Sequence, residues 1–536
     1  MGNRAWKHWV IASILAVALW AAGSSEAEDK GQPKAFNSTV AFNVYAVTGE
    51  EDQLLVGTTP SARPLDIPLC HSWYVEPRPP VDMEKVSQEV EAQRIPALKL
   101  RDATNADLKH LRRVTTLQRL YLRETRVTDA GLQYLKGLAR LQCLDLWHTE
   151  VTDAGLKHLE GLTALQELDL GRTEVTDAGM DHLKGLTQLQ YLDLPTGVTD
   201  AALEHLRGLT TLERLDLAGT KVTDAGLQHL KGLTALQELN LGATKVTDTG
   251  LENLKGLTAL RQLYLFGTWV GDAGLEHLKG LTALQVLYLT DTQVTDAGLL
   301  HLKGLTALQW LNLLGTRVTD AGLEHLKGLT QLQRLGLRAT QVTGEGLDHL
   351  NGLTQLRYLD LPTGVTDAGL GHLKGLTALQ GLDLFGTEVT DAGLEHLKGL
   401  TALQELDLAS TKVMGPGLEH LRGLTALRQL DLRWDKMLTD AGLVHLEQMR
   451  QLQRLYLGGT HVTDAGLVYL KQMTQLERLD LSDTAVTDAG LEYLKELSAL
   501  QELNLLGTKV TDAGVQQLKK SLPNVQVPEV KVRGWR

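Results

Sequence analysis

Aromatic residues are scarce in this chain of 536 residues: Phe, Trp and Tyr together make up 4%, and Phe occurs only 4 times. Large cores rely on aromatic side chains because each one buries a wide apolar area. Single cores also stop growing at about 250–300 residues. The composition therefore excludes one large globular core and favours either several domains or a stacked array.

Cysteine and net positive charge are also lacking. The two cysteines are Cys70 and Cys143, too few for a disulfide framework or a cysteine-rich zinc site. Whether they pair with each other is left open. The formal net charge is −12, which disfavours binding to nucleic acid, because that function needs a basic field facing the phosphates.

Long hydrophobic runs are absent except near the N-terminus. There, Arg4 and Lys7 precede an apolar run at residues 10–22, and Ser25-Glu26-Ala27 offers small residues to a signal peptidase. The run is too short to cross ~30 Å of hydrocarbon as a helix. Residues 1–27 are therefore predicted to be an export signal, and no transmembrane segment is expected after its removal. The expected location is secreted, periplasmic or at the cell surface.

Regularly spaced leucine is what the chain does contain. The unit L-x-x-L-x-L-x-x-T-x-V-T-D-A-G-L-x-x-L-x-x-L-x-x recurs seventeen times, with a step of 24 residues that becomes 23 after Leu189 and Leu356 and 25 after Leu427. Fixed periods of this length are typical of solenoids. The units begin at Leu117, Leu141, Leu165, Leu189, Leu212, Leu236, Leu260, Leu284, Leu308, Leu332, Leu356, Leu379, Leu403, Leu427, Leu452, Leu476 and Leu500.

Each segment of the unit predicts a local structure. In L-x-x-L-x-L the last two leucines alternate with exposed residues, which indicates a short strand with one buried face. Thr-Asp offers oxygen acceptors to free amides at a helix start, and the leucines of A-G-L-x-x-L lie on one helical face. The glycine in Lys136-Gly137-Leu138 ends that helix. Stacking then places each leucine over its counterpart in the next unit and builds one long core.

These repeats resemble the leucine-rich-repeat superfamily. The V-T-D-A-G-L element is similar to the 24-residue, helix-bearing repeats of bacterial secreted and surface proteins and to those of F-box-associated proteins. The resemblance implies an α/β fold: a curved solenoid with a parallel β-sheet on the concave face and short helices on the convex face. One departure is that Thr125, Thr149 and Thr173 stand where many family members place Asn after the strand. A hydroxyl would then replace the amide in the turn.

The ends of the chain differ from the repeats. Residues 28–80 alternate like strands, which predicts a small β-rich module or an extended arm. Residues 81–116 are expected to form an N-terminal helical cap and a degenerate first repeat, residues 117–521 the seventeen repeats, and residues 522–536 a C-terminal cap strand. Two units carry Pro195 and Pro362 at matching positions, seven units apart, and share a one-residue deletion that a block duplication would produce.

Side chains between the strand leucines face the predicted concave surface, where no core requirement fixes their identity. Aromatic residues gather there in three consecutive middle units, and Tyr and Trp are enriched at interface hot spots. We predict a partner-binding patch at this place, with packing of the rings along the sheet as the structural alternative. The patch comprises Tyr264, Phe266, Trp269, Tyr288, Trp310 and Leu314.

Aspartate is the middle residue of L-x-L in many other units. A basic or glycan ligand is one interpretation of this acidic row. The simpler interpretation is a solvated sheet face, with arginines two residues earlier in the units neutralising part of the charge. The aspartates are Asp145, Asp169, Asp193, Asp216, Asp360, Asp383, Asp407, Asp431 and Asp480, and the arginines are Arg119, Arg214, Arg334, Arg454 and Arg478.

No catalytic, cofactor or metal site is predicted. The sequence has no Gly-rich phosphate loop, no G-x-S-x-G and no H-E-x-x-H. A row of helix histidines recurs once per unit, too widely spaced for the ~2.0–2.1 Å contacts of one zinc ion. One Asp per strand does not guarantee the converging oxygens that calcium needs.

The sequence thus predicts a monomeric, exported binding module that presents its concave face to a protein and is not an enzyme. Two alternatives remain. One is an F-box-like substrate-recognition receptor for ubiquitin ligation, suggested by the similarity to F-box-associated repeats. The other is a structural cell-envelope protein without a dedicated ligand. The export signal, and the lack of an F-box-like segment before Leu98, argue against the first alternative.

Overall fold

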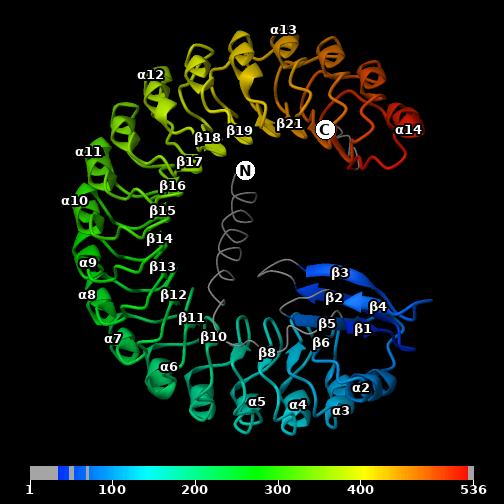
Figure 1. The fold of residues 1–536 in the computed structure, drawn as a ribbon, viewed down its shortest axis with the longest axis vertical. Helices are drawn as coiled ribbons and strands as arrows, with labels where there is room; N and C mark the ends of the chain where they lie inside the picture. The colour runs from blue at the N-terminus through cyan, green and yellow to red at the C-terminus, as the bar shows by residue number, and fades with distance from the viewer. Residues whose placement is uncertain (1–33, 48–52, 68–71, 529–536) are drawn as a thin grey trace, which may run out of the picture. The chain divides into compact units, whose positions relative to one another are not determined.

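The computed structural model describes residues 34–47, 53–67 and 72–528. They belong to two compact units, residues 1–268 and 269–536, called unit 1 and unit 2 and described separately (Figure 1). The predicted export signal, Cys70 and the last eight residues of the predicted C-terminal cap lie outside the described residues.

Unit 1 begins with a small β-sheet. Strand β2 lies between β3 and β5 and is antiparallel to both, while β1 and β4 form a separate antiparallel pair. Parallel pairing of Val75 with Leu98 joins β5 to the first strand of the repeats. Helix α2 follows and buries Met83, Val86 and Val90. The bounds are β1 Lys34–Phe36, β2 Phe42–Val47, β3 Gln53–Thr58, β4 Leu65–Ile67, β5 Ser72–Pro77 and α2 Met83–Ala92.

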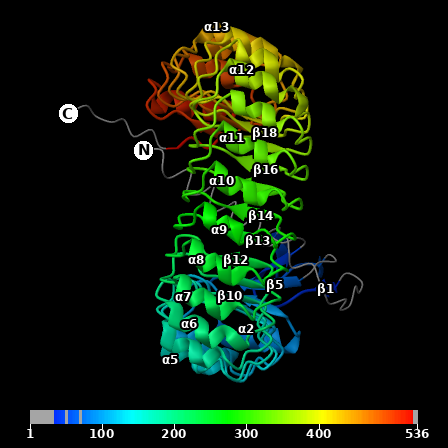
Figure 2. The same cartoon turned by 90° about the vertical axis from the view of Figure 1, so that its left-hand side faces the viewer.

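The rest of unit 1 is a stack of repeats, each with a three-residue strand on the inner side and a short helix on the outer side (Figures 1 and 2). Leu120, Leu144 and Leu168 pair in parallel register and are fully buried. Burying a leucine contributes roughly 1.5–3 kcal/mol, so the aligned rows form the core. The strands are β6 Ala97–Lys99, β7 Arg119–Tyr121, β8 Cys143–Asp145, β9 Glu167–Asp169, β10 Tyr191–Asp193, β11 Arg214–Asp216, β12 Glu238–Asn240 and β13 Gln262–Tyr264. The helices are α3 Asn105–Leu111, α4 Asp129–Leu132, α5 Asp153–Leu156, α6 Asp200–His205, α7 Asp224–Leu227 and α8 Asp248–Leu251, with 3-10 turns η1 Gln133–Leu135, η2 Asp177–Leu183, η3 Leu206–Gly208, η4 Gln228–Leu230 and η5 Glu252–Leu254.

Unit 2 repeats the same arrangement, and Leu359, Leu382 and Leu406 are again in parallel register. Its last described segment makes a single parallel bridge between Glu502 and Gln526. The strands are β14 Val286–Tyr288, β15 Trp310–Asn312, β16 Arg334–Gly336, β17 Tyr358–Asp360, β18 Gly381–Asp383, β19 Glu405–Asp407, β20 Gln429–Asp431, β21 Arg454–Tyr456, β22 Arg478–Asp480 and β23 Glu502–Asn504. The helices are α9 Asp272–Glu276, α10 Asp296–Leu299, α11 Asp320–Leu323, α12 Asp367–Leu370, α13 Asp440–Leu443 and α14 Asp512–Ser521, with 3-10 turns η6 Leu300–Leu302, η7 Glu324–Leu326, η8 Glu345–Leu350, η9 Gly371–Gly375, η10 Gly393–Leu397, η11 Pro416–Gly423, η12 Val444–Leu446, η13 Gly466–Leu470 and η14 Gly490–Leu494. The predicted α/β solenoid with a parallel sheet is confirmed.

The threonine after each strand closes the turn within its own repeat. The Thr125 hydroxyl donates to the carbonyl of Leu122 at 2.6 Å, and the Thr149 hydroxyl donates to the carbonyl of Leu146 at 2.7 Å. Both threonines are buried, where an unsatisfied carbonyl would be costly. The hydroxyl therefore performs the role that the sequence comparison assigned to it.

The T-D-A-G motif ties each helix start to the preceding repeat. The Asp129 carboxylate accepts the backbone N–H of Thr152 at 2.8 Å and its hydroxyl at 2.7 Å. The Thr152 side chain in turn accepts the N–H of Ala154 and caps α5. A Cβ at Gly155 would collide with Oδ1 of Asp129, so glycine permits the approach. The aspartate of one repeat thus stabilises the helix start of the next repeat.

Candidate partner-binding face

The six residues of the predicted patch divide between the two units. Two of them belong to unit 1 and four to unit 2. The structure therefore does not bring the whole set together within one unit, and the patch as a set stays a prediction. The unit 1 members are Tyr264 and Phe266, and the unit 2 members are Trp269, Tyr288, Trp310 and Leu314.

The members of the patch differ widely in burial. Tyr264 and Tyr288 are 1% and 4% exposed, whereas Trp269 is 63% exposed; Phe266, Trp310 and Leu314 are half-buried. The ring centroids of Tyr288 and Trp310 lie 5.5 Å apart, and burial raises the pKa of Tyr288. These two rings pack along the sheet, which was the structural alternative. Trp269 is the member with the largest exposed fraction.

Unit 2 carries an acidic row that the predicted patch did not include. Asp360, Asp383, Asp407 and Asp431 occupy the last position of β17, β18, β19 and β20, where the four strands pair in register. Neighbouring strands are separated by about 4.8 Å. Four carboxylates therefore lie along one line across the sheet.

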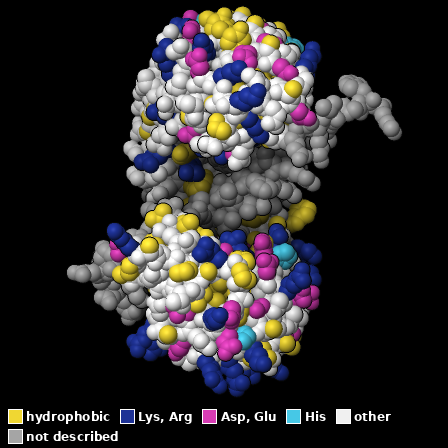
Figure 3. Space-filling model, turned by 90° about the vertical axis from the view of Figure 1, so that its right-hand side faces the viewer, with side chains coloured by type: hydrophobic (Ala, Val, Ile, Leu, Met, Phe, Trp, Pro, Cys, Tyr) yellow, Lys and Arg dark blue, Asp and Glu magenta, His cyan; other side chains and the backbone are white. Residues whose placement is uncertain are grey.

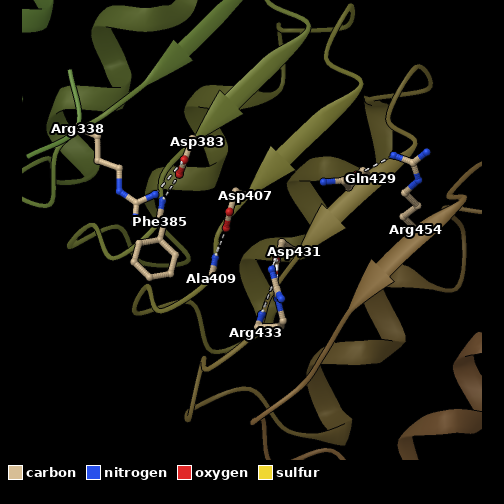
Figure 4. Close-up of polar contacts among 9 residues, drawn as sticks. All are labelled: Arg338, Asp383, Phe385, Asp407, Ala409, Gln429, Asp431, Arg433 and Arg454. Carbon is tan, nitrogen blue, oxygen red and sulfur yellow. Dashed lines mark hydrogen bonds and ion pairs between the residues drawn. The ribbon is translucent and has the colours of Figure 1, made fainter. Parts of the chain in front are cut away.

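Backbone amides hold three of the four carboxylates. Asp383 accepts the N–H of Phe385 at 2.7 Å, and Asp407 accepts the N–H of Ala409 at 2.8 Å (Figure 4). Asp431 accepts the N–H of Arg433 at 3.0 Å in the same way. The residue two positions after Asp360 is Pro362, which has no N–H to donate. Asp360 thus lacks the hydrogen bond that fixes its neighbours.

Arginines stacked on aromatic rings lie beside the acidic row. The Arg338 guanidinium is 4.4 Å from the Phe385 ring and 3.6 Å from the Asp383 carboxylate. Arg433 donates from Nε to both Asp431 oxygens at 3.0 and 2.9 Å. Farther along, Arg454 donates to the Gln429 side chain at 3.3 Å (Figure 4).

A second stacked arginine group lies before the row. The Arg334 guanidinium lies 4.3 Å from each of the rings of Trp310 and Tyr358. Because cation–π contacts favour one orientation of the guanidinium over a ring, this arginine is held in place.

Two carboxylates of the acidic row differ from the others in their ion pairs. Among the described residues, neither Asp360 nor Asp407 forms an ion pair, whereas Asp383 and Asp431 do. Burial, reinforced by Asp383 and opposed by Arg338 and Arg334, raises the pKa of Asp360 to about 7. Burial, reinforced by Asp431 and Asp383, raises the pKa of Asp407 to about 8. The fold therefore leaves two carboxylates that an external cation would stabilise.

Three of the arginines predicted to neutralise the row form ion pairs with glutamates, while Arg214 and Arg334 also act on Asp216 and Asp360. Arg119, Arg214 and Arg478 pair with Glu167, Glu238 and Glu502, which lie on the same side-chain row. The arginines that reach aspartates lie two positions beyond the middle residue of L-x-L: Arg123, Arg338 and Arg433. From that later position Arg433 pairs with the aspartate of its own repeat, Arg123 with those of the next two repeats, and Arg338 with that of the second repeat along.

Unit 1 has an acidic row of its own: Asp145, Asp169, Asp193 and Asp216. Arg123 bridges Asp145 and Asp169 at 3.2 Å each. Burial raises the pKa of Asp169 to about 6 and that of Asp193 well above its usual value. Asp193, like Asp360, is followed two positions later by a proline.

The other sequence candidates do not form a chemical centre in the described residues. No group of three or more His, Cys, Asp or Glu side chains there could hold a metal ion. Cys143 is a buried free thiol, and burial raises its pKa well above the ordinary value. Across the same part of the chain, no helix has the length and apolar character needed to cross a membrane.

Parallel strands on one side and short helices on the other, repeated along the chain, define a solenoid protein. Family models described as leucine-rich repeat region and leucine rich repeat match residues 271–526, 139–196 and 208–230. The chain is a leucine-rich-repeat protein. Comparison with curated protein sequences finds no match.

Solved structures similar to this chain include one with a TM-score above 0.5, which shows the same fold. The mouse RP105/MD-1 complex has 17% identity, covers 83% of this chain and 80% of that chain, and gives a TM-score of 0.51. A Leptospira interrogans leucine-rich-repeat protein has 20% identity over 83% of this chain and 92% of its own, with a TM-score of 0.43. An internalin from Listeria monocytogenes has 24% identity over 60% of this chain and 82% of its own, also with 0.43. The leucine-rich-repeat fold commonly mediates protein–protein interaction and is typically non-enzymatic.

Proposed function

We propose that this chain is an exported, monomeric protein that binds a protein partner on the inner face of its sheet. The observation that carries the proposal is the sheet face of unit 2. Leucine rows already complete the core, so the fold does not need the stacked Arg338–Phe385 pair or the unpaired Asp360 and Asp407. Aromatic and arginine side chains held in fixed positions are typical of interface hot spots.

Charge supports a protein ligand over a nucleic acid. The net charge is −12, and the sheet face of unit 2 presents carboxylates in its middle. On the surfaces seen in Figure 3, basic and acidic side chains are interspersed within each unit. Binding to phosphates would need a basic field instead.

The test is partner capture by the full chain, followed by cross-linking and mass spectrometry of an extracellular or envelope fraction. We expect one dominant partner, retained by Glu395→Gln on the helix side and lost by Arg338→Glu combined with Phe385→Ala. Trp269→Ala tests the predicted patch in the same assay. No dominant partner would instead favour a structural envelope protein. N-terminal sequencing is expected to show removal of residues 1–27, and an uncleaved chain in the cytosol would contradict export.

A further inference from the structure

Two carboxylates on the sheet face of unit 2 form no ion pair among the described residues, although Arg334 and Arg338 lie close enough to act on Asp360 and Arg433 on Asp407. Asp360 and Asp407 have no ion pair in the described part of the chain, while Asp383, on the strand between them, is paired to Arg338. All three side chains are half-buried and keep some exposed surface. A ligand can therefore reach the two free carboxylates without displacing an existing arginine.

The spacing of these carboxylates defines a ligand pattern. Asp360 and Asp407 are separated by two strand-to-strand steps, or roughly 9.6 Å at ~4.8 Å per step. A peptide in the polyproline II conformation has three residues per turn and advances about 3.1 Å per residue, so side chains three positions apart lie on one face and are separated by roughly 9.3 Å. A segment lying across the strands would place two such side chains at the two carboxylates.

The walls of the row favour a long basic side chain. Phe385, stacked on Arg338, follows Asp383 by two residues, and Tyr456, whose ring is 5.0 Å from the Arg433 guanidinium, pairs with Asp431 at the end of the row. Lysine and arginine carry apolar stems that pack on such rings while the charged end reaches a carboxylate. An acidic or phosphorylated segment would meet four carboxylates against three arginines already engaged.

Resting on the proposed protein-binding function, we infer that unit 2 recognises a basic segment of its partner in the polyproline II conformation, with two Lys or Arg residues three positions apart bound by Asp360 and Asp407. This sheet face is then a receptor for a cationic peptide.

The probe is a synthetic peptide, acetyl-Gly-Lys-Ser-Ser-Lys-Gly-amide, titrated calorimetrically into the full chain at pH 8.5 and about 0.1 M ionic strength, where the Debye length is ~10 Å. We expect saturable binding, weakened ~10-fold when the lysines are made adjacent, as expected for loss of one charged hydrogen bond. The same peptide with glutamates in place of lysines should not bind. Equal affinity for both lysine peptides would overturn the inference, because it would indicate general charge attraction.

Matched variants separate the site from overall charge. Asp360→Asn with Asp407→Asn is expected to lower affinity at least ~10-fold, again from lost charged hydrogen bonds. Glu395→Gln with Glu419→Gln makes the same charge change on the helix side, where both side chains are exposed, and should stay within about twofold by screening. Equal losses in both variants would overturn the inference. If the natural partner is captured equally well by the chain with both Asp→Asn changes, the inferred peptide site is also wrong. The proposed protein-binding function would still stand.

Discussion

Unit 1 and unit 2 carry aspartates at corresponding positions of the sheet, but the side chains next to these carboxylates differ. Across the seven-unit shift, Asp216 matches Asp383, while Asn240 matches Asp407. In unit 1 the Asn240 amide donates to the Asp216 carboxylate at 3.0 Å. In unit 2 the matching residue is a carboxylate and supplies no such donor. One amide-to-acid difference therefore changes a hydrogen-bonded pair into adjacent like charges.

One aspartate in each unit lacks the backbone hydrogen bond that its neighbours accept. Asp193 and Asp360 match across the same shift, and each is followed two positions later by proline, Pro195 or Pro362. The neighbouring aspartates accept an N–H at that position, as Asp216 does from Ala218 at 2.8 Å. Both proline-linked aspartates have a raised pKa, caused first by burial and then by a neighbouring aspartate. The repeat thus provides each aspartate with a backbone N–H two positions later, and a single proline at that position removes it.

The largest effect is expected from making unit 1 resemble unit 2. Asn240→Asp removes the amide donor and places a buried carboxylate beside Asp216. At pH 8 we expect a loss of about 1–3 kcal/mol, the usual cost of an unsatisfied buried group. Differential scanning calorimetry should show a lower apparent Tm at pH 8 and a smaller difference at pH 4, where the added group is protonated. An unchanged Tm at pH 8 would show that the amide is not what relieves Asp216.

The reverse change in unit 2 should stabilise it. The pKa of Asp407 is raised from 3.8 to about 8, so between pH 4 and 8 the unfolded chain loses its proton first. The free energy of unfolding therefore falls as pH rises through this window. Asp407→Asn removes that fall while keeping an acceptor for Ala409. Asp383, Asp431 and Arg433 are the charged groups that act on this carboxyl.

We expect the Tm of Asp407→Asn to match the wild type at pH 4 and to exceed it by about 2–4 °C at pH 8.5, the shift for ~1 kcal/mol in a unit of this size. The effect is smaller than for Asn240→Asp because the half-buried Asp407 is partly screened by solvent. Glu395→Gln, an exposed change of equal charge, should show no such pH dependence. A Tm below the wild type at pH 8.5 would contradict the pKa direction. If the Asp407→Asn variant is more stable than the wild type but binds the lysine peptide more weakly, Asp407 contributes to ligand binding at a cost in stability.

The fold was predictable from sequence because each leucine has a counterpart one repeat away that fixes its depth and register. The sequence indicated a hydroxyl at Thr125 in place of an amide, and the structure supplies its acceptor, the carbonyl of Leu122. The ion pairs were not predictable in the same way, because their span along the sheet varies: Arg433 pairs with Asp431 of its own repeat, whereas Arg338 follows β16 and reaches Asp383 on β18. The burial of Tyr288 also depends on neighbours outside its own repeat. The one signal that sequence did contain was the Asp-Leu-Pro order, which removes a donor from Asp360.

The smallest expected effect restores that donor. Pro362→Ala returns an N–H two positions after Asp360, where Ala409 serves Asp407. A hydrogen bond to the ionised form lowers a carboxyl pKa, so the pKa of Asp360 should fall from about 7 towards its ordinary range. Carboxyl NMR titration measures this directly, and Pro195→Ala is the matched test for Asp193. Stability should change little, because a hydrogen bond worth about 1 kcal/mol offsets the ~0.4–1 kcal/mol lost with the proline restraint. If neither pKa moves, burial and neighbouring charge alone govern these two aspartates, and the missing amide does not distinguish them from the rest of each row.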